Sequence, residues 1–459
     1  MVADQGLRTE LPVAPLALVG FMASLINTLP IPLLPDLPRL LGTTPAAAYW
    51  TVTATLLVAA VATPIAGRLG DMYGKRRVLL ACLALMVAGS AVCALAGSAT
   101  TLIIGRALQG CAAGGLPLGL SILRDELPSH RLGRALAVMS ASVGVGGTVG
   151  FPVAALLAQH ADRHVLFAVV TLLGVVNLAM VVRLVPGGRG GHGGRFDWSG
   201  AVTLSAGTTC LLLALSKGRE WGLAAGVALA GAGAVAMAAW VRRELSARDP
   251  LVNLRVLARG PVLLVNVATL LVGFAMFALS LVFPQVLQAP AGLGYGGGMS
   301  MVAAGFVLAP AGVAMMAVAP LAPRLAARWR NKGVLVAGCL IVGGGYGLLV
   351  LDLRGSAWMV LPGIVVGAGL ALAFYAMPAV IAANAPAREI AAANGANSLL
   401  RQFGATLSSA VTSAVFAGFG LQAGYPAHAA LVVALLAACL ACVVAAVVAA
   451  LLPGDMLPM

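Results

Sequence analysis

The chain has 459 residues, of which 61% are hydrophobic and only 9% are charged, and its mean hydropathy is +1.01. Such a composition leaves too few polar residues to cover a water-soluble protein, so that class is excluded and a polytopic membrane protein is predicted. The formal net charge of +14 would suit a nucleic-acid partner, but the cations gather in short segments between long apolar runs.

A membrane-spanning helix needs about 20 mainly apolar residues. By this measure the sequence predicts an all-α membrane protein with fourteen transmembrane helices. The predicted spans cover roughly residues 14–34, 47–67, 78–98, 101–123, 134–157, 165–185, 198–216, 222–241, 261–287, 298–320, 333–351, 357–383, 396–419 and 428–452.

The topology follows from lysine and arginine, which favour cytoplasmic loops. With the N-terminus placed inside, 21 cations fall in cytoplasmic segments and 5 in outer loops, while Arg106 and Arg401 lie within spans. This asymmetry explains the positive charge without nucleic acid. We expect a multi-pass protein of the cytoplasmic (inner) membrane, with both termini in the cytoplasm.

The first span contains Asn27 and Thr28 and then becomes rich in proline. Pro30 and Pro32 are expected to unwind its outer half, close to Asp36. Prolines at this point, together with a mixed charge before the span, do not fit a cleaved signal peptide.

The charged segment Gly67–Arg77 reads GRLGDMYGKRR and separates two apolar runs. Its three glycines predict a tight turn, because glycine accepts a positive φ without steric cost. An ordinary cytoplasmic hairpin would need only the basic residues, whereas Asp71 between Gly70 and Gly74 is an additional feature. The segment resembles the motif G-x-L-a-D-r-x-G-r-[KR]-[KR] between helices 2 and 3 of the major facilitator superfamily.

The resemblance implies a conformational role for Gly67, Asp71, Gly74, Lys75 and Arg76. Asp71 would stabilise one transport state by lying at the positive N-terminus of a helix in the other half of the protein. It would be released when the halves part on the inner side.

The stretch Pro64–Arg76 aligns with Pro320–Lys332, where Ala327 replaces Asp71. Both copies follow the second span of a six-span block if spans 7 and 8 are an insertion; chance similarity between two basic turns is the alternative. The predicted organisation is an N-terminal six-helix bundle, a linker with two inserted helices and a cytoplasmic loop, and a C-terminal six-helix bundle, over residues 1–185, 186–260 and 261–459.

The region between the blocks begins with a glycine-rich linker at 186–195. Asp197 is then expected to cap span 7, and an outer turn at 218–222 and an inner segment at 249–255 follow. These three features look like the fourteen-helix drug:proton antiporter branch of the superfamily.

Span 4 contains Arg106 and Gln109, similar to the family's R-x-x-q-G. A bare arginine in hydrocarbon is costly, so it must face a partner or a wet cavity. The resemblance implies a role in proton transfer or in orienting polar groups of the cavity. The alternative is a structural arginine bonded to carbonyls of neighbouring helices.

Span 5 contains Gly146, Gly150 and Pro152, which fit the antiporter motif G-x-x-x-G-P-x-x-G-G only in part. The proline is one residue late, and alanines replace the final glycines. Small residues at this spacing let helices approach closely, and proline bends a span. We therefore expect a helix-packing role, with a weaker indication of antiport.

The second half contributes further polar and aromatic side chains to a predicted substrate cavity, together with Asn27, Thr28, Arg106 and Gln109. They are Asn266, Gln285, Gln288, Phe374, Tyr375 and Asn397. Arg401 lies close to the cytoplasmic end of its span. We therefore expect its long side chain to extend toward the membrane surface, with the charge in water.

Span 1 departs from the antiporter branch, because Ile26 takes the position of that branch's buried aspartate. No acidic residue falls mid-span, so Arg106 has no facing carboxylate that the sequence identifies. Asp36 is the candidate that an unwound proline segment would bring inward. The missing anion favours neutral or anionic substrates over cations.

The sequence predicts a secondary active transporter that exports small, largely apolar compounds by alternating access. The proton gradient is its expected energy source, with no bound cofactor or metal, and a monomer surrounded by lipid is its expected state. A lipid exporter without a buried-carboxylate site is the first alternative. A membrane enzyme would need paired carboxylates or clustered histidines that the spans lack, and a non-transporting sensor is the third alternative.

Overall fold

The computed structural model describes residues 13–31, 33–34, 36–160, 163–187, 196–247, 251, 254–258, 260–353, 358–384, 390–422 and 424–453. Most of the predicted glycine-rich linker, part of the predicted inner segment and both chain ends lie outside these residues. The chain forms two compact units, Met1–Ala201 and Val202–Met459. They are called the N-terminal unit and the C-terminal unit.

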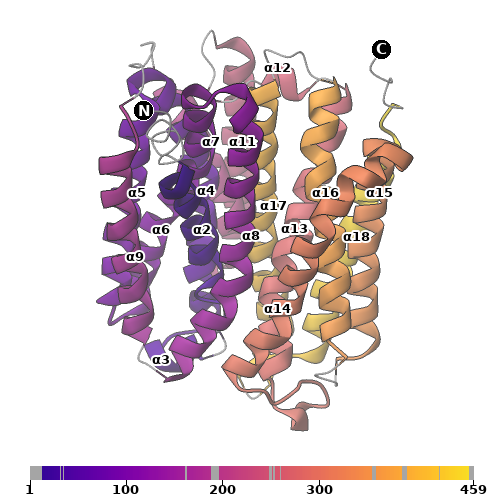
Figure 1. Ribbon diagram of the computed structural model, residues 1–459. Coiled ribbons are helices and arrows are strands. Elements are labelled where there is room, and N and C mark those ends of the chain that lie inside the picture. Colours follow the sequence, from indigo (N-terminus) through magenta and orange to yellow (C-terminus); the bar gives the residue numbers. More distant parts are fainter. Residues whose placement is uncertain are drawn as a thin grey trace. The chain divides into compact units, whose positions relative to one another are not determined.

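The N-terminal unit consists of helices packed side by side. They are α2 (Val13–Thr28), α3 (Leu37–Leu41), α4 (Pro45–Tyr73), α5 (Lys75–Ala94), α6 (Ala99–Gly110), the 3-10 helix η1 (Cys111–Gly114), α7 (Gly115–Glu126), α8 (Ser129–His160) and α9 (Arg163–Leu184). Figure 1 shows α5 beside both α6 and α9.

The C-terminal unit has the same all-helical construction. Its elements are α10 (Trp198–Trp221, whose first turn precedes the boundary), α11 (Leu223–Ser246), α12 (Leu254–Leu257), α13 (Gly260–Gln288), η2 (Ala291–Leu293), α14 (Met301–Val318), η3 (Ala319–Leu321), α15 (Ala322–Leu351), α16 (Val360–Asn384), α17 (Ile390–Phe419), β1 (Leu421–Gln422), β2 (Tyr425–Pro426) and α18 (His428–Ala450). In Figure 1, α15 lies beside α16 and α18.

Each of the fourteen predicted spans corresponds to one α-helix, except span 4, which corresponds to α6, η1 and α7 together. Among the described residues, nine helical stretches are long and apolar enough to cross a membrane, and one of them joins α14 to α15. The shorter apolar helix α2, part of α8, the pair α6 and α7, and the more polar α17 complete the set. The prediction of an all-α membrane protein with fourteen spans is confirmed.

The charged segment Gly67–Arg77, predicted as a tight turn, is mostly helical, and the turn is confined to Gly74. α4 continues to Tyr73, α5 begins at Lys75, and only Gly74 between them has a positive φ, of 99°. Gly70 serves packing instead, because a Cβ there would lie 2.5 Å from Leu118 Cδ2. One residue with φ > 0 is enough to end one helix and begin the next.

Span 4 was predicted as one helix, but the structure divides it into α6, η1 and α7. The division falls in a glycine-rich stretch, where helix propensity is low. At Gly110 a Cβ would lie 2.5 Å from the Thr55 carbonyl oxygen, and at Gly115 it would lie 2.8 Å from Val19 Cγ1. α4 and α2 therefore pack closely against the two ends of this 3-10 turn, which is narrower than an α-helix.

The aligned segment of the C-terminal unit contains a helix break at the same position. Within α15 one residue is non-helical, Arg330, with φ 63° and ψ 162°. It is the one non-glycine residue with positive φ in the part of the chain that the structure describes. Arg330 aligns with Gly74, and this coincidence supports an internal repeat over chance similarity.

Replacing Arg330 with glycine should stabilise the protein. A residue other than glycine is strained by about 1–3 kcal/mol in this backbone region. Glycine avoids this strain but lowers the folding stability by about 0.5–1 kcal/mol, because its unfolded chain has more conformational freedom to lose. We expect the thermal unfolding midpoint in detergent to rise. Arg328→Gly, in the helical turn just before, should lower the midpoint; a similar fall for both variants would show that Arg330 is unstrained.

The two inserted helices pack within the C-terminal unit. Leu204 of α10, Trp240 of α11 and Leu257 of α12 form one buried apolar cluster with Ala396 and Leu399 of α17. The inserted pair is therefore anchored on the span-13 helix by ordinary apolar burial.

The start of α10 follows the capping prediction. The backbone N–H of Gly200 donates to Asp197 Oδ1 at 2.9 Å, and Ser199 Oγ donates to the same oxygen at 2.7 Å. An aspartate in this position satisfies an otherwise unpaired helix N–H.

A short hairpin precedes α18. Strands β1 and β2 pair antiparallel, with Leu421 opposite Pro426 and Gln422 opposite Tyr425. Tyr295, in the segment between α13 and α14, donates its hydroxyl to the Pro426 carbonyl. Burial, and secondarily the neighbouring Tyr425, raises the pKa of Tyr295 to about 12, so this hydroxyl remains a donor at cellular pH.

Candidate functional site

Arg106 is the most deeply buried charge among the described residues of the N-terminal unit, with 1% of its surface exposed. It lies on α6 and donates from Nε to the Thr51 carbonyl of α4 at 3.0 Å. From Nη1 it donates to the Ile26 carbonyl of α2 at 2.9 Å and to Gln109 Oε1 at 2.6 Å. One guanidinium thus ties three helices together.

The contact with Ile26 has a cause in the sequence. A helical carbonyl normally accepts from the N–H four residues later, and here that residue is Pro30, which has no N–H. α2 ends at Thr28, as the proline pattern predicts, and leaves the Ile26 carbonyl open. Arg106 supplies the missing donor.

Gln109 extends the network to α5. Its Nε2 donates to Ser90 Oγ at 2.8 Å, and Ser90 Oγ donates to the Met86 carbonyl at 2.9 Å. Two glycines make this approach possible, because a Cβ at Gly105 would lie 2.6 Å from Cys93 Sγ and one at Gly89 would lie 2.6 Å from the Gly105 carbonyl oxygen. The polar chain therefore depends on close α5–α6 packing.

The partners of Arg106 are all neutral. Among the described residues its remaining nitrogen, Nη2, has no hydrogen-bond partner. A buried guanidinium with a donor to spare is equipped to bind a carbonyl or an anion.

A second buried polar cluster lies in the C-terminal unit, between α13 and α17. Asn397 Nδ2 donates to Asn266 Oδ1 at 3.0 Å and to Thr269 Oγ1 at 2.6 Å. In the described part of the chain, Asn266 Nδ2 has no hydrogen-bond partner. This cluster offers a polar ligand group one donor, and its three side chains carry no charge.

Glycines again permit this contact. A Cβ at Gly273 of α13 would lie 2.5 Å from the Arg401 carbonyl oxygen of α17. Gly404 of α17 likewise lies against the backbone of α13 at Leu270. The helices approach closely enough for short amide side chains to meet.

The predicted cavity residues of span 1 bond within their own helix. Asn27 Nδ2 donates to the Ala23 carbonyl at 3.0 Å, and Thr28 Oγ1 donates to the Leu25 carbonyl at 3.0 Å. Asp36 lies beyond the helix, where its Oδ1 is 3.6 Å from Nη2 of the exposed Arg39. Its side chain is 40% exposed, so the structure shows it as a surface carboxylate.

The motif residues around Gly74 lie at the surface of the N-terminal unit. Asp71 and Gly67 belong to the last turns of α4, and the Asp71 side chain is exposed. Lys75 Nζ lies 2.6 Å from Asp125 Oδ2 at the end of α7, and Arg76 donates to the Val182 carbonyl of α9 at 2.7 Å. The cations of the motif thus join α5 to its neighbours.

The small residues of span 5 face α2. A Cβ at Gly146 would lie 2.5 Å from the Phe21 carbonyl oxygen, and one at Gly150 would lie 2.7 Å from Thr28 Oγ1. Pro152 lies inside α8. The glycines of α8 thus allow a close contact between α8 and α2, both within the N-terminal unit.

The other predicted cavity residues are divided between burial and partial exposure. Gln285 and Gln288 are buried in α13, whereas Phe374 and Tyr375 are half-buried in α16. Arg401 has its Cζ 5.2 Å from the centroid of the Phe374 ring, so its charge has an aromatic partner inside the unit.

Sequence reasoning missed several partners in these networks. The Ile26 and Thr51 carbonyls carry no side-chain signal, and Ser90 and Thr269 are ordinary polar residues in apolar runs. Glu244 is a further omission, because α11 extends to Ser246 and buries this carboxylate to 2% exposure. Its position after the apolar run gave no sign of burial.

A family model described as the Major Facilitator Superfamily matches residues 16–409. The chain belongs to the Major Facilitator Superfamily. The match covers most of the chain and agrees with the paired helical units and the repeated helix break. This facilitator is therefore a multi-pass membrane transporter and not an enzyme.

Known relatives and structures agree with this placement. This facilitator is 27% identical over 374 residues to multidrug resistance protein 3 of Bacillus subtilis, covering 79% of this chain and 71% of that protein. It is 30% identical over 383 residues to the tetracenomycin C resistance and export protein of Streptomyces glaucescens, covering 80% and 68%.

Two solved structures share the fold of this facilitator. An auto-inhibited peptide transporter of the POT family has a TM-score of 0.69 at 17% identity, covering 98% of both chains. A mutant form of the nucleoside transporter NupG has a TM-score of 0.64 at 14% identity, covering 96% of this chain and 100% of that one.

Proposed function

We propose that this transporter exports small, largely apolar, neutral or anionic compounds from the cytoplasm by alternating access of its two halves. The names of the two relatives, multidrug resistance protein 3 and the tetracenomycin C resistance and export protein, support drug efflux. The charge preference rests on the structure of Arg106.

Arg106 is the observation that carries the proposal. It is buried, its hydrogen-bond partners are neutral, and its Nη2 has no partner among the described residues. A unit charge pair at about 4 Å interacts by about 4 kcal/mol at an effective dielectric near 20. A cationic substrate that comes this close is repelled, whereas a carbonyl or carboxylate gains a partner.

Flux measurements in everted membrane vesicles test the charge preference. A neutral or acidic antibiotic should be transported efficiently, ethidium poorly, and a bis-quaternary dye of similar size not at all. Asp36→Asn is compared with Asp125→Asn, which removes another surface carboxylate. Efficient dication export that only Asp36→Asn abolishes would reject the proposal, and transport of a fluorescent lipid alone would favour the lipid exporter.

We further propose proton antiport as the energy source, as the resemblance to the drug:proton antiporters implies. Two carboxylates are candidates for the proton carrier: Glu244, which is buried in α11, and Asp36. Substrate-induced proton release from vesicles should be lost in Glu244→Gln or in Asp36→Asn. Proton release that survives both substitutions would exclude these carriers.

The proposed topology places both termini in the cytoplasm, because 21 loop cations then lie inside and 5 outside. Reporter fusions at Gly190, Gly218 and the C-terminus should report inside, outside and inside. A C-terminus on the outer side would refute this arrangement.

A further inference from the structure

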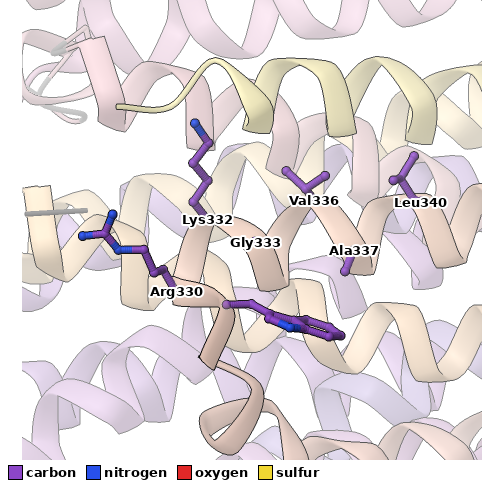
Figure 2. Close-up of a pocket in the computed structure, with 7 residues that line it drawn as sticks. Arg330, Lys332, Gly333, Val336, Ala337 and Leu340 are labelled. Atoms are coloured by element: carbon purple, nitrogen blue, oxygen red, sulfur yellow. The ribbon is translucent and has the colours of Figure 1, made fainter. Parts of the chain in front are cut away.

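A groove of about 520 Å³ opens on the surface of α15, immediately after the helix break at Arg330. Figure 2 shows Arg330 and Lys332 at one end and Val336 and Leu340 farther along the same helix. The groove therefore has a cationic end and an apolar end.

The cationic end is strongly one-sided in charge. The stretch Ala322–Lys332 contains Arg324, Arg328, Arg330 and Lys332 and no acidic residue. Residues 333–351 after it contain no charged residue. Arg330 and Lys332 thus lie where the helix passes from the charged loop into its apolar span, which is where we expect the lipid headgroups.

The apolar end follows the helix repeat. Lys332, Val336 and Leu340 are four residues apart and lie on one side of α15 in Figure 2. This row extends about 12 Å along the axis at 1.5 Å per residue. Leu340 is 52% exposed, whereas four other residues of the same helix are fully buried: Val334, Leu335, Cys339 and Val342.

Trp329 and Gly333 complete the groove. Trp329 is 49% exposed beside the cations, the kind of side chain that settles at a membrane interface. Gly333 has no side chain to fill the space, and a Cβ there would lie 3.1 Å from Trp329 Cβ.

The strained backbone gives an independent indication of a functional site. The helix break of the first repeat is at Gly74, which adopts a positive φ without strain. The break of the second repeat is at Arg330, an arginine with a positive φ that favours glycine. Observed strain of this kind points to function. Lys332 Nζ donates to the Leu452 carbonyl, but an ammonium has three donors and a guanidinium five, so both groups can serve a further partner.

We propose that an acidic phospholipid binds in this groove, with its phosphate at Arg330 and Lys332 and one acyl chain along Val336 and Leu340. Charge complementarity selects an anionic headgroup, and the apolar row selects a lipid over a free anion. The site is independent of the transported substrate, and its test does not require transport.

Tryptophan quenching by brominated lipids tests the proposal in the full-length protein in detergent. Phosphatidylglycerol with brominated chains should quench a signal that is absent in Trp329→Phe. Each cation near a membrane surface contributes about 1 kcal/mol, or about fivefold in affinity. Phosphatidylglycerol should therefore be preferred over brominated phosphatidylcholine by about thirtyfold, and by about fivefold in Arg330→Gln.

Matched variants separate a defined site from diffuse attraction. Arg328→Gln removes the same charge outside the groove and should leave the preference within about twofold. Arg330→Gly removes the charge while relieving the backbone and should behave like Arg330→Gln. Equal quenching by both lipids, an equal loss in Arg328→Gln, or displacement by sodium phosphate but not by sodium chloride of equal ionic strength would overturn the proposal.

Discussion

Arg106→Leu should abolish transport and destabilise the N-terminal unit. The substitution leaves the Ile26 carbonyl and Gln109 Oε1 buried without their donor. A buried group left unpaired costs about 1–3 kcal/mol, so the two together cost roughly 2–6 kcal/mol. Arg106→Lys keeps the charge but loses the fork geometry, and its thermal unfolding midpoint should lie between those of the wild type and the leucine variant.

A compensating substitution separates the structural role of Arg106 from its role in transport. Pro30→Ala restores an N–H that the Ile26 carbonyl can accept, because residue 30 is four positions later. In the Arg106→Leu background it should recover about 1 kcal/mol of stability without restoring flux. Recovery of flux along with stability would show that Arg106 is only a structural brace.

Asp71→Asn should slow transport by about twofold to thirtyfold while the protein still folds. The resemblance implies that Asp71 stabilises one transport state through a helix terminus, which is worth about 0.3–2 kcal/mol. Within its own unit the carboxylate is exposed in the last turn of α4, where it opposes the helix dipole. Removing its charge therefore costs the fold nothing.

Two controls accompany the Asp71 measurement. Asp125→Asn removes a neighbouring carboxylate that pairs with Lys75 at the surface, and exposed pairs contribute little, so flux should change less than twofold. Ala327→Asp places a carboxylate at the aligned position of the second repeat and should give no gain. If Asp71→Asn transports at the wild-type rate, the motif has no conformational role and its basic residues only set the membrane topology.

The sequence by itself determined the features that depend on neighbouring residues. Apolar runs of spanning length gave the fourteen helices, Pro30 ended α2, and Asp197 capped α10. Hydropathy, capping and proline act over a few residues, so each can be read locally.

Only the tertiary structure decided which polar groups meet. Arg106 bonds to Ile26, 80 residues away, and Asn397 bonds to Asn266, 131 residues away. These contacts depend on how each helix is rotated and how closely it packs, which glycines such as Gly105 and Gly404 set through backbone contact with another helix. The same reason explains why three glycines near Asp71 looked alike in sequence although only Gly74 breaks the helix: a glycine's role is set by what lies against it.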